Sequence, residues 1–268
     1  MKKSLIALAI AGAVAAPAIA EDSPHTLSAN VGLATDYIFR GISQTDHKPA
    51  IQGGFDYSHA SGLYAGTWAS NVSWVDNGIK DDNSMEWDFY AGYRGSFAGD
   101  FTYDVGGLYY FYPGKQKEEA PGALPQIESP NSFELYASIG WKFLTLKYSH
   151  ALSENLFAWQ GYDKTTGWNR KDTKGSGYLD LTASYPIAEG WTIIGHVGHQ
   201  KIKNNSSASY TDWKLGVTKD VGFGVVGLSY TDTNARGCGD SHAMYCWGNR
   251  ANVDVGKGRA VLSFTKSF

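Results

Sequence analysis

The feature that most constrains the fold is a two-residue alternation of apolar and polar side chains that recurs along most of the chain. In Phe133–Trp141, the residues Phe, Leu, Ala, Ile and Trp alternate with Glu, Tyr, Ser and Gly. The same alternation runs through Leu179–Tyr185 and Trp213–Val217. Successive side chains of a β-strand point to opposite faces, so this pattern predicts half-buried strands and not helices.

The predicted strands are joined by connections that alternate between long and short. We place about twelve strands, at 26–35, 50–57, 63–70, 85–94, 101–111, 133–141, 144–150, 178–185, 191–200, 209–218, 223–231 and 258–268. The long connections are near 36–49, 71–84, 112–132, 151–177, 201–208 and 232–257, and the short ones near 58–62, 95–100, 142–143, 186–190 and 219–222. This rhythm predicts an up-and-down antiparallel transmembrane β-barrel, for which 10 or 14 strands are also compatible with the pattern.

The N-terminus has the features of a secretory signal peptide. Lys2 and Lys3 precede an apolar stretch, and the pattern Ala18-Ile19-Ala20 resembles a cleavage site. We expect cleavage after residue 20, which leaves one barrel domain over 21–268. An N-terminal membrane anchor is the alternative. No later stretch is apolar enough for a membrane-spanning helix, so an exported barrel would lie in the bacterial outer membrane.

The composition is compatible with a barrel and excludes several other classes. The chain is 14% aromatic, contains 32 Gly and carries a formal net charge of -3. These values argue against a disordered chain, a long helical bundle and a nucleic-acid-binding protein. The remaining alternative is a soluble β-sandwich or propeller, which would not need every second connection to be short.

The two faces of the predicted strands differ in chemistry. Aromatic residues near strand ends are expected to form two lipid-facing girdles, with Tyr57, Trp141, Tyr185, Trp191, Phe101 and Phe223 at the short-turn end and Trp68, Trp87 and Phe133 nearer the long loops. The opposite face carries the charged residues expected to line the lumen: Asp56, Asp88, Arg94, Asp104, Glu134, Lys147, Asp180, Lys214 and Arg259. Charges of both signs predict a transverse field and not strong ion selection.

The C-terminus has the pattern of an assembly signal. The chain ends on Phe268, and Leu262 and Phe264 share its face at two-residue steps. We expect the outer-membrane barrel assembly machinery to recognise this strand. Lys266 departs from the pattern, which prefers an apolar residue there.

The first long connection carries a distinctive motif. Residues 35–45 read Thr-Asp-Tyr-Ile-Phe-Arg-Gly-Ile-Ser-Gln-Thr. With its flanks, from residue 28 to residue 75, this segment closely resembles the N-terminal signature of the TorF porin family, also known as the Gcw_chp family. The resemblance implies a Gram-negative outer-membrane β-barrel over the whole mature chain. Because the function of the family is itself only inferred, the resemblance implies no catalytic or binding residues.

The residues offer little support for catalysis or metal binding. Cys238 and Cys246 lie close together in the last long loop, which predicts a disulfide in an oxidising compartment. The alternative, a metal held with His242, lacks a fourth ligand. Ser149 and His150 are adjacent and point to opposite faces, so they cannot act as nucleophile and base. We therefore predict no enzyme, no metal and no cofactor.

The function predicted from the sequence is a porin-like channel for the passive diffusion of small hydrophilic solutes. The expected partners are outer-membrane lipids and lipopolysaccharide, the barrel assembly machinery and small polar solutes, but no nucleic acid. Both mature termini and the short turns would be periplasmic, and the long loops extracellular. The loop at 151–177, which holds Leu156, Phe157 and Trp159, is the predicted plug.

Two other functions remain open at this stage. One is a non-conducting structural or partner-binding barrel whose lumen is closed by cross-strand ion pairs of Arg94 or Lys147. The other is a barrel hydrolase, which the sequence supports least. Acidic loop residues, among them Asp76, Asp81, Asp82, Glu118 and Glu119, would bind divalent ions that bridge lipopolysaccharide, or would simply be solvated.

Overall fold

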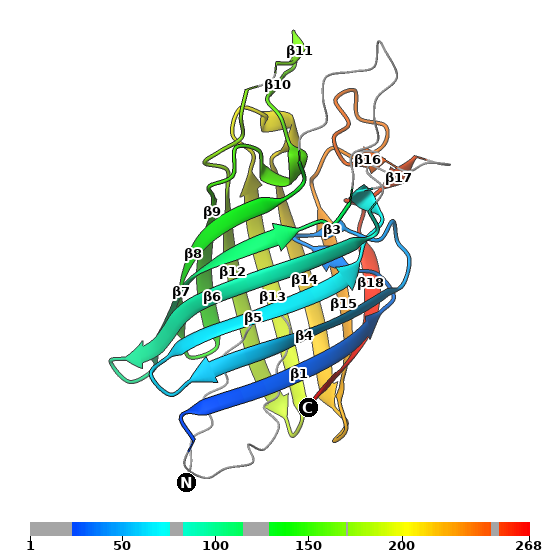
Figure 1. Ribbon diagram of the computed structural model, residues 1–268. Coiled ribbons are helices and arrows are strands. Elements are labelled where there is room, and N and C mark those ends of the chain that lie inside the picture. The colour runs from blue at the N-terminus through cyan, green and yellow to red at the C-terminus, as the bar shows by residue number, and fades with distance from the viewer. Residues whose placement is uncertain (1–22, 76–82, 115–128, 170, 248–251) are drawn as a thin grey trace.

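Twelve long strands form one closed antiparallel barrel in the computed structural model, which describes residues 23–75, 83–114, 129–169, 171–247 and 252–268 (Figure 1). The strands are β1 (His25–Ala34), β4 (Ala50–His59), β5 (Leu63–Asn71), β6 (Met85–Phe97), β7 (Phe101–Phe111), β8 (Ser132–Trp141), β9 (Leu144–Ala151), β12 (Gly177–Ala188), β13 (Trp191–Lys201), β14 (Tyr210–Asp220), β15 (Val225–Thr233) and β18 (Arg259–Ser267). Each strand pairs with its neighbours in the chain, and β1 closes the barrel by pairing with β18. The predicted fold class and the predicted number of twelve strands are confirmed.

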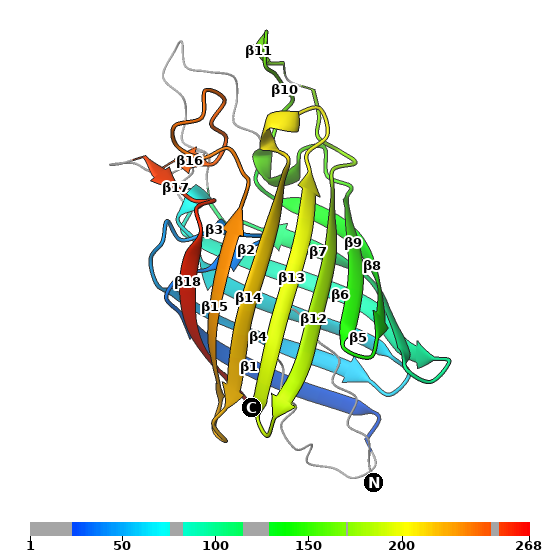
Figure 2. The ribbon, with the colours of Figure 1, turned by 180° about the vertical axis from the view of Figure 1, so that it is seen from behind.

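The long connections lie at one end of the barrel and the short turns at the other, where the C-terminus also lies (Figures 1 and 2). The long loops contain the short strand pairs β2 (Ile38–Phe39) with β3 (Ile42–Ser43), β10 (Tyr162–Asp163) with β11 (Gly167–Trp168), and β16 (Cys246–Trp247) with β17 (Val253–Asp254). They also contain the 3-10 turns η1 (Leu156–Ala158) and η2 (Ser206–Ala208). The predicted signal peptide and the acidic residues Asp76, Asp81, Asp82, Glu118 and Glu119 lie outside the described residues.

Alternation along each strand gives the barrel an apolar outer face. Leu135, Leu215 and Leu228 point outward and are about half exposed, and their sequence neighbours point inward. Exposed aromatic side chains near the short turns include Trp141, Tyr185, Trp191 and Phe223. No helix among the described residues is long and apolar enough to cross a membrane.

One residue assigned to the outer aromatic girdle lies on the other face. Trp68 shares the inward face of β5 with Tyr64 and Ser70, and its ring packs edge-on against Tyr37, with the ring centroids 5.3 Å apart. The assignment of Trp68 to a lipid-facing girdle is therefore wrong. The reason is that Tyr37 belongs to a loop that folds inward and provides an apolar surface inside the barrel.

Burial of the inward-facing residues changes along the barrel axis. In the half nearer the long loops, which we call the loop half, these residues are buried: Ser70, Glu86, Asp88, Tyr110, Ser132, Glu134, Ser149, Ala151, Tyr178, Asp180, Gln200, Tyr210, Asp212, Thr231 and Val261. In the half nearer the short turns, which we call the turn half, inward-facing residues such as Tyr64, Arg94 and Lys214 are partly or fully accessible. The inward-facing side chains are thus buried at the loop end of the barrel and accessible toward the turn end.

Candidate functional site: a hairpin inside the lumen

The segment that enters the loop half is the hairpin β2–β3, in the first long connection. Its turn consists of Arg40 and Gly41, both with positive φ (47° and 79°). A two-residue hairpin with positive φ at both turn positions has a type I′ turn, which matches the twist of the flanking strands. A Cβ on Gly41 would lie 2.5 Å from Asp212 Cβ and from Thr233 Cγ2, so the tip touches the barrel wall at β14 and β15.

The hairpin crosses the lumen. It arises between β1 and β4, and the order of strands around the barrel places β9 and β12 opposite this pair. The tip residue Arg40 binds Glu134 on β8 and Gln200 on β13, which flank that opposite wall. The hairpin therefore spans the barrel from one side to the other.

Arg40 is the contact that fixes the tip. Its Nη1 donates to Glu134 Oε1 at 3.0 Å and to Gln200 Oε1 at 2.8 Å, and its Nη2 donates to Glu134 Oε2 at 2.6 Å. The guanidinium also lies over the rings of Phe39 and Tyr178, at 4.8 and 4.4 Å from their centroids. The Glu134 side chain is 1% exposed. A bidentate, buried pair of this kind gives a fixed geometry.

Asp36 holds the base of the hairpin. Its Oδ1 accepts hydrogen bonds from the hydroxyls of Ser43 and Thr45, and its Oδ2 contacts His47 Nδ1 at 3.0 Å and accepts from Arg259 Nη1 at 2.8 Å. Asp36 is 2% exposed. Four side chains thus converge on one buried carboxylate.

Acidification is expected to loosen the hairpin through Asp36. Burial raises the pKa of the Asp36 carboxyl, but hydrogen bonds from His47, Ser43, Arg259 and Thr45 outweigh burial and lower this pKa below its usual value. The stabilisation by Asp36 is therefore complete above about pH 5 and is lost as the pH falls through the lowered pKa. Hydrogen exchange of the amides of residues 37–45, measured by mass spectrometry between pH 3 and pH 7, checks this.

The matched variant for this experiment is Asp36→Asn. We expect the amides of residues 37–45 to exchange faster in this variant than in the native protein at pH 7. After correction for the intrinsic exchange rate, we expect protection of the variant to depend much less on pH than protection of the native protein. Equal protection of the native and variant hairpins at pH 7 would contradict the role given to Asp36.

The hairpin is also attached to two other long loops. The carbonyl of Gln44 accepts from the amides of Ser73 and Trp74, and next to this contact the Tyr37 hydroxyl donates to Glu86 Oε1 of the barrel strand β6 at 2.6 Å. On the other side, the Ser43 amide donates to the Val255 carbonyl at 2.9 Å. These contacts join the hairpin to the loops that follow β5 and β15.

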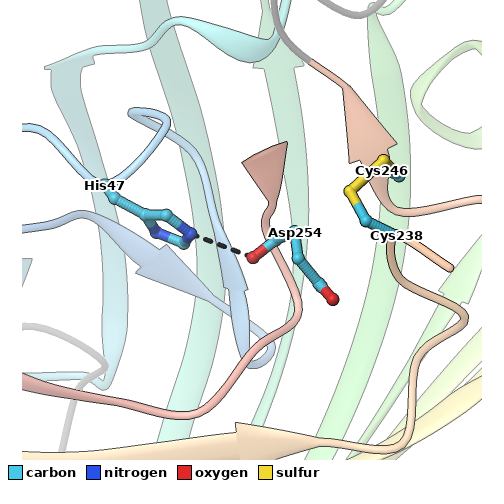
Figure 3. The surroundings of a disulfide bond; sticks show 4 residues. All are labelled: His47, Cys238, Cys246 and Asp254. Carbon is cyan, nitrogen blue, oxygen red and sulfur yellow. Dashed lines mark hydrogen bonds between the residues drawn. A yellow bond between two sulfur atoms is a disulfide. The ribbon is translucent and has the colours of Figure 1, made fainter. Parts of the chain in front are cut away.

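A disulfide lies next to the attachment point at β17. His47 Nε2 contacts the Asp254 carbonyl oxygen at 2.9 Å (Figure 3). Asp254 pairs in β17 with Cys246 of β16, and Cys246 is disulfide-bonded to Cys238. The disulfide therefore closes the loop that holds the base of the hairpin.

The loop at 151–177, predicted to be the plug, supplies only a second layer. Leu156 is fully buried, and the Phe157 ring packs edge-on against Phe39 and Tyr110, with the centroids 5.7 and 4.9 Å apart. Trp159 lies further out, against Tyr245 and Trp168. The predicted plug, the loop at 151–177, covers the segment that enters the lumen, and the prediction did not identify that segment, the hairpin β2–β3. The hairpin takes the inner position because its tip residue Arg40 binds Glu134 and Gln200 on the polar lumen wall.

The predicted lumen residues of the turn half lie among tyrosines. Asp56 accepts from the Tyr90 hydroxyl at 2.6 Å, and Asp104 accepts from the Tyr64 hydroxyl at 2.5 Å. Tyr64 and Tyr136 also share a hydrogen bond between their hydroxyls. Each of these rings lies over an inward-facing glycine of a neighbouring strand, where a Cβ would collide with it: Gly66 beneath Tyr90, Gly92 beneath Tyr64 and Gly106 beneath Tyr136.

The predicted basic residues of the lumen occupy different environments. The Arg94 guanidinium lies 5.0 Å from the ring centroid of Tyr64, and Lys147 Nζ lies 3.9 Å from that of Tyr136. Lys214 is exposed on the inward face of β14. Arg259 binds Asp36. Among the described residues, no ion pair joins Arg94 or Lys147 to a carboxylate, so the cross-strand pairs imagined for a closed lumen are not formed.

The remaining predicted acidic residues lie in the loop half. Glu134 binds Arg40, and Asp88 is buried, with no hydrogen-bond partner for its Oδ1 among the described residues. Asp180 belongs to a cluster that sequence reasoning did not identify. His196 Nδ1 lies 2.7 Å from Asp180 Oδ2, and His196 Nε2 lies 2.8 Å from Asp212 Oδ2. Both ring nitrogens face carboxylates, an arrangement that suits the doubly protonated imidazolium.

The other predicted site residues lie away from the lumen. Leu262, Phe264 and Phe268 share the outer face of the last strand, as expected from their spacing, and Lys266 Nζ lies 5.1 Å from the Phe268 ring centroid. In the described part of the chain, no group of three or more His, Cys, Asp or Glu side chains is arranged to hold a metal ion.

The motif at 35–45 supplies most of the site, although sequence reasoning gave it no role. Asp36, Ser43 and Thr45 form the base, Tyr37 binds Glu86, and Arg40 with Gly41 forms the tip. One signal could have identified this hairpin. A short Ile-Phe-Arg-Gly-Ile-Ser segment places the turn dipeptide Arg-Gly between two pairs that each begin with Ile, which is a hairpin pattern.

A family model and several solved structures are similar to this chain. The model of a bacterial protein family of unknown function, Gcw_chp, matches residues 18–268. No curated protein matches. Among solved structures, the KdgM porin has a TM-score of 0.53 and 9% sequence identity, covering 90% of this chain and 99% of that chain. A second structure of KdgM, in complex with disordered oligogalacturonate, has a TM-score of 0.52 and 8% identity, covering 90% and 98%.

The NanC porin is similar to the same degree. It has a TM-score of 0.52 and 12% identity, covering 91% of this chain and 99% of that chain. At such low identities the likeness concerns the barrel fold alone.

Proposed function

The chain belongs to the bacterial family of unknown function Gcw_chp, and we propose that it is an outer-membrane, porin-like channel for the passive diffusion of small hydrophilic solutes. The observation that carries the proposal is the lining of the turn half. This lining is polar, charged and accessible, with Tyr64, Arg94 and Lys214 on the inward face of a closed barrel. A barrel with a purely structural role has no need of accessible charges on its inward face.

The outer face supports a place in a membrane. Large apolar side chains such as Leu135, Leu215 and Leu228 remain exposed around the barrel, and burial of such surface in lipid removes it from water. The proposal includes short turns and mature termini in the periplasm, long loops outside, contact with lipopolysaccharide, and recognition of the C-terminal strand by the assembly machinery. It also includes an export signal at residues 1–20.

The name suggested by the sequence resemblance, the TorF porin family, is part of this proposal. One similar barrel supports the proposed class of solute. KdgM has been solved with oligogalacturonate, which is a polar solute. We propose no catalytic role and no cofactor for this chain.

A second candidate function is favoured by the filled loop half. Glu134, Gln200 and Asp212 are almost fully buried beneath the hairpin, so the loop half has little room for solutes while the hairpin is docked. A barrel that never releases the hairpin would be a non-conducting structural or partner-binding protein.

Conductance distinguishes these two functions. We expect the purified protein, inserted into planar lipid bilayers, to give small stepwise currents, because water and ions reach the hairpin from the turn half and pass when it moves. Liposome swelling with uncharged sugars of increasing size gives the size limit. A heat-dependent shift on gels verifies that each preparation contains folded barrel.

The non-conducting alternative makes the opposite prediction. It is supported if neither the native protein nor a variant with a released hairpin, such as Arg40→Ala, gives any stepwise current across salts and voltages. That result, obtained with protein that is folded on gels, would overturn the channel proposal.

A further inference from the structure

The charged groups that line the lumen differ in how well they are satisfied. Each carboxylate of the turn half accepts a hydrogen bond from the protein, Asp56 from Tyr90 and Asp104 from Tyr64. Asp180 and Asp212, at the border of the loop half, are bound to His196. By contrast, within the described residues the nitrogen atoms of Arg94, Lys147 and Lys214 donate to no acceptor of the protein. Among the charged groups of the accessible lining, those without a protein partner are therefore cationic.

Two of these cations are held in position without being neutralised. Arg94 lies over Tyr64 and Lys147 over Tyr136, with distances of 5.0 and 3.9 Å to the ring centroids. A cation over an aromatic face keeps its charge and its outward-pointing N–H groups. The side chains are thus pre-organised to bind an anion, and less side-chain entropy is lost when they do so.

The three cations form a band along the lumen wall. Arg94 is on β6, Lys147 on β9 and Lys214 on β14, so each lies three strands from the next in the order of the barrel. Arg94 and Lys147 share one row of paired residues, through Asp104 and Ser138. With about 4.8 Å between strands, the strands that carry neighbouring cations are roughly 14 Å apart around the wall. A solute inside the lumen therefore meets cations on more than one side.

The accessible lining also carries more positive than negative charge. Away from the strand ends, three described cations face two carboxylates there, Asp56 and Asp104; Asp220, the last residue of β14, lies at the turn. The carboxylates of Asp180 and Asp212 are 9% and 1% exposed and enclose a histidine. A count of lumen charges from the sequence mixes these buried carboxylates with the accessible ones, and this is why it predicts no selection.

We propose that the lumen takes small anionic solutes, those that carry a carboxylate or phosphate group, and that Arg94, Lys147 and Lys214 are the residues that select them. This inference rests on the proposed channel function and adds to it the class of solute. An anionic group in the lumen meets these three cations, and a cation of similar size meets only carboxylates that are already hydrogen-bonded. Hydrogen bonding to the cations and the local electric field therefore both favour anionic solutes.

Reversal potentials in planar bilayers test the proposal. A tenfold KCl gradient is applied to the native protein and to Arg40→Ala, which keeps the measurement possible if the docked hairpin restricts current. We expect the reversal potential to lie between zero and the equilibrium potential of chloride. Lys214→Gln is expected to shift it toward potassium, and the triple replacement of Arg94, Lys147 and Lys214 by Gln is expected to shift it further.

Lys219→Gln is the matched control on the same strand. Lys219 points outward at the short-turn end of β14, where its Nζ donates to the Glu189 carbonyl at 2.9 Å. The variant removes the same charge from the same strand without touching the lumen, so its reversal potential is expected to equal that of the native protein. Liposome swelling with sodium acetate and sodium phosphate then distinguishes the two classes of anion.

Each outcome decides between the proposals. A potassium-selective or unselective current in the native protein overturns the anion proposal and leaves the channel function standing. Equal shifts in Lys214→Gln and Lys219→Gln also overturn it. Absence of current from both the native protein and Arg40→Ala overturns the channel function and this inference together. Heat-dependent gel mobility of every variant verifies that lost selectivity does not reflect a lost fold.

Discussion

Replacement of Arg40 by alanine is expected to give the largest increase in conductance of any single substitution in this chain. The change leaves the Glu134 carboxylate buried without its bidentate partner, and truncation of one member of a buried ion pair costs about 3–5 kcal/mol. Such a cost shifts the ratio of docked to released hairpin by roughly two to four powers of ten. We therefore expect single-channel conductance to rise toward that of an unobstructed barrel of this size.

The control for this prediction is an arginine outside the lumen. Arg236 pairs with Asp240 in the loop after β15, where both side chains are about one-third exposed. Exposed pairs contribute at most about 1 kcal/mol, so Arg236→Ala is expected to leave the conductance unchanged. Single-channel recording of both variants is the measurement. Equal conductance of Arg40→Ala and the native protein would mean that Arg40 does not hold the hairpin.

Removal of the disulfide is expected to give the second largest effect, although Cys238 and Cys246 do not line the lumen. The bond closes a ring across a sequence separation of 8, and the chain-entropy relation assigns about 2–3 kcal/mol to a ring of this size. Loss of the bond removes a constraint on β16, and β17 is held by its pairing with β16. The carbonyl groups of Asp254 and Val255, which contact His47 and the Ser43 amide, then lose their fixed position. We expect a reductant to raise the conductance of the native protein and the hydrogen exchange of the hairpin.

The double variant with Ser at positions 238 and 246 serves as the control for the reductant. It is expected to have the raised conductance from the start and to show no response to reduction. A response of equal size in the native protein and in this variant would mean that the reductant acts elsewhere, and would contradict the contact route from the disulfide to the hairpin.

The sequence predicts the barrel well because the barrel depends on a local rule. Glu134 lies between Phe133 and Leu135, so an apolar outer face places the carboxylate inside whatever the rest of the chain does. Twelve repetitions of this pattern, with alternating loop lengths, define the topology. The predicted strand bounds differ from the observed ones by three residues at most, at the ends of β6 and β12.

The contents of the barrel could not be predicted in the same way, because they depend on contacts between distant residues. Arg40 and Glu134 are separated by 94 positions, and no periodicity links them. His196 appears in the sequence as a single histidine, and only the register of β12, β13 and β14 brings it between two carboxylates. Trp68 was misassigned because an aromatic residue suits either lipid or a folded loop.

The position of Asp36 has a consequence for the order in which the molecule assembles. Asp36 is the second residue after the first strand, and its partner Arg259 is the first residue of the last one. The Thr35 amide likewise donates to the Leu262 carbonyl across the pairing of β1 with β18. The hairpin can take its final place only after the two ends of the chain have met. During biogenesis an incomplete barrel would therefore hold an unanchored hairpin, and its docking would mark the closure of the cylinder.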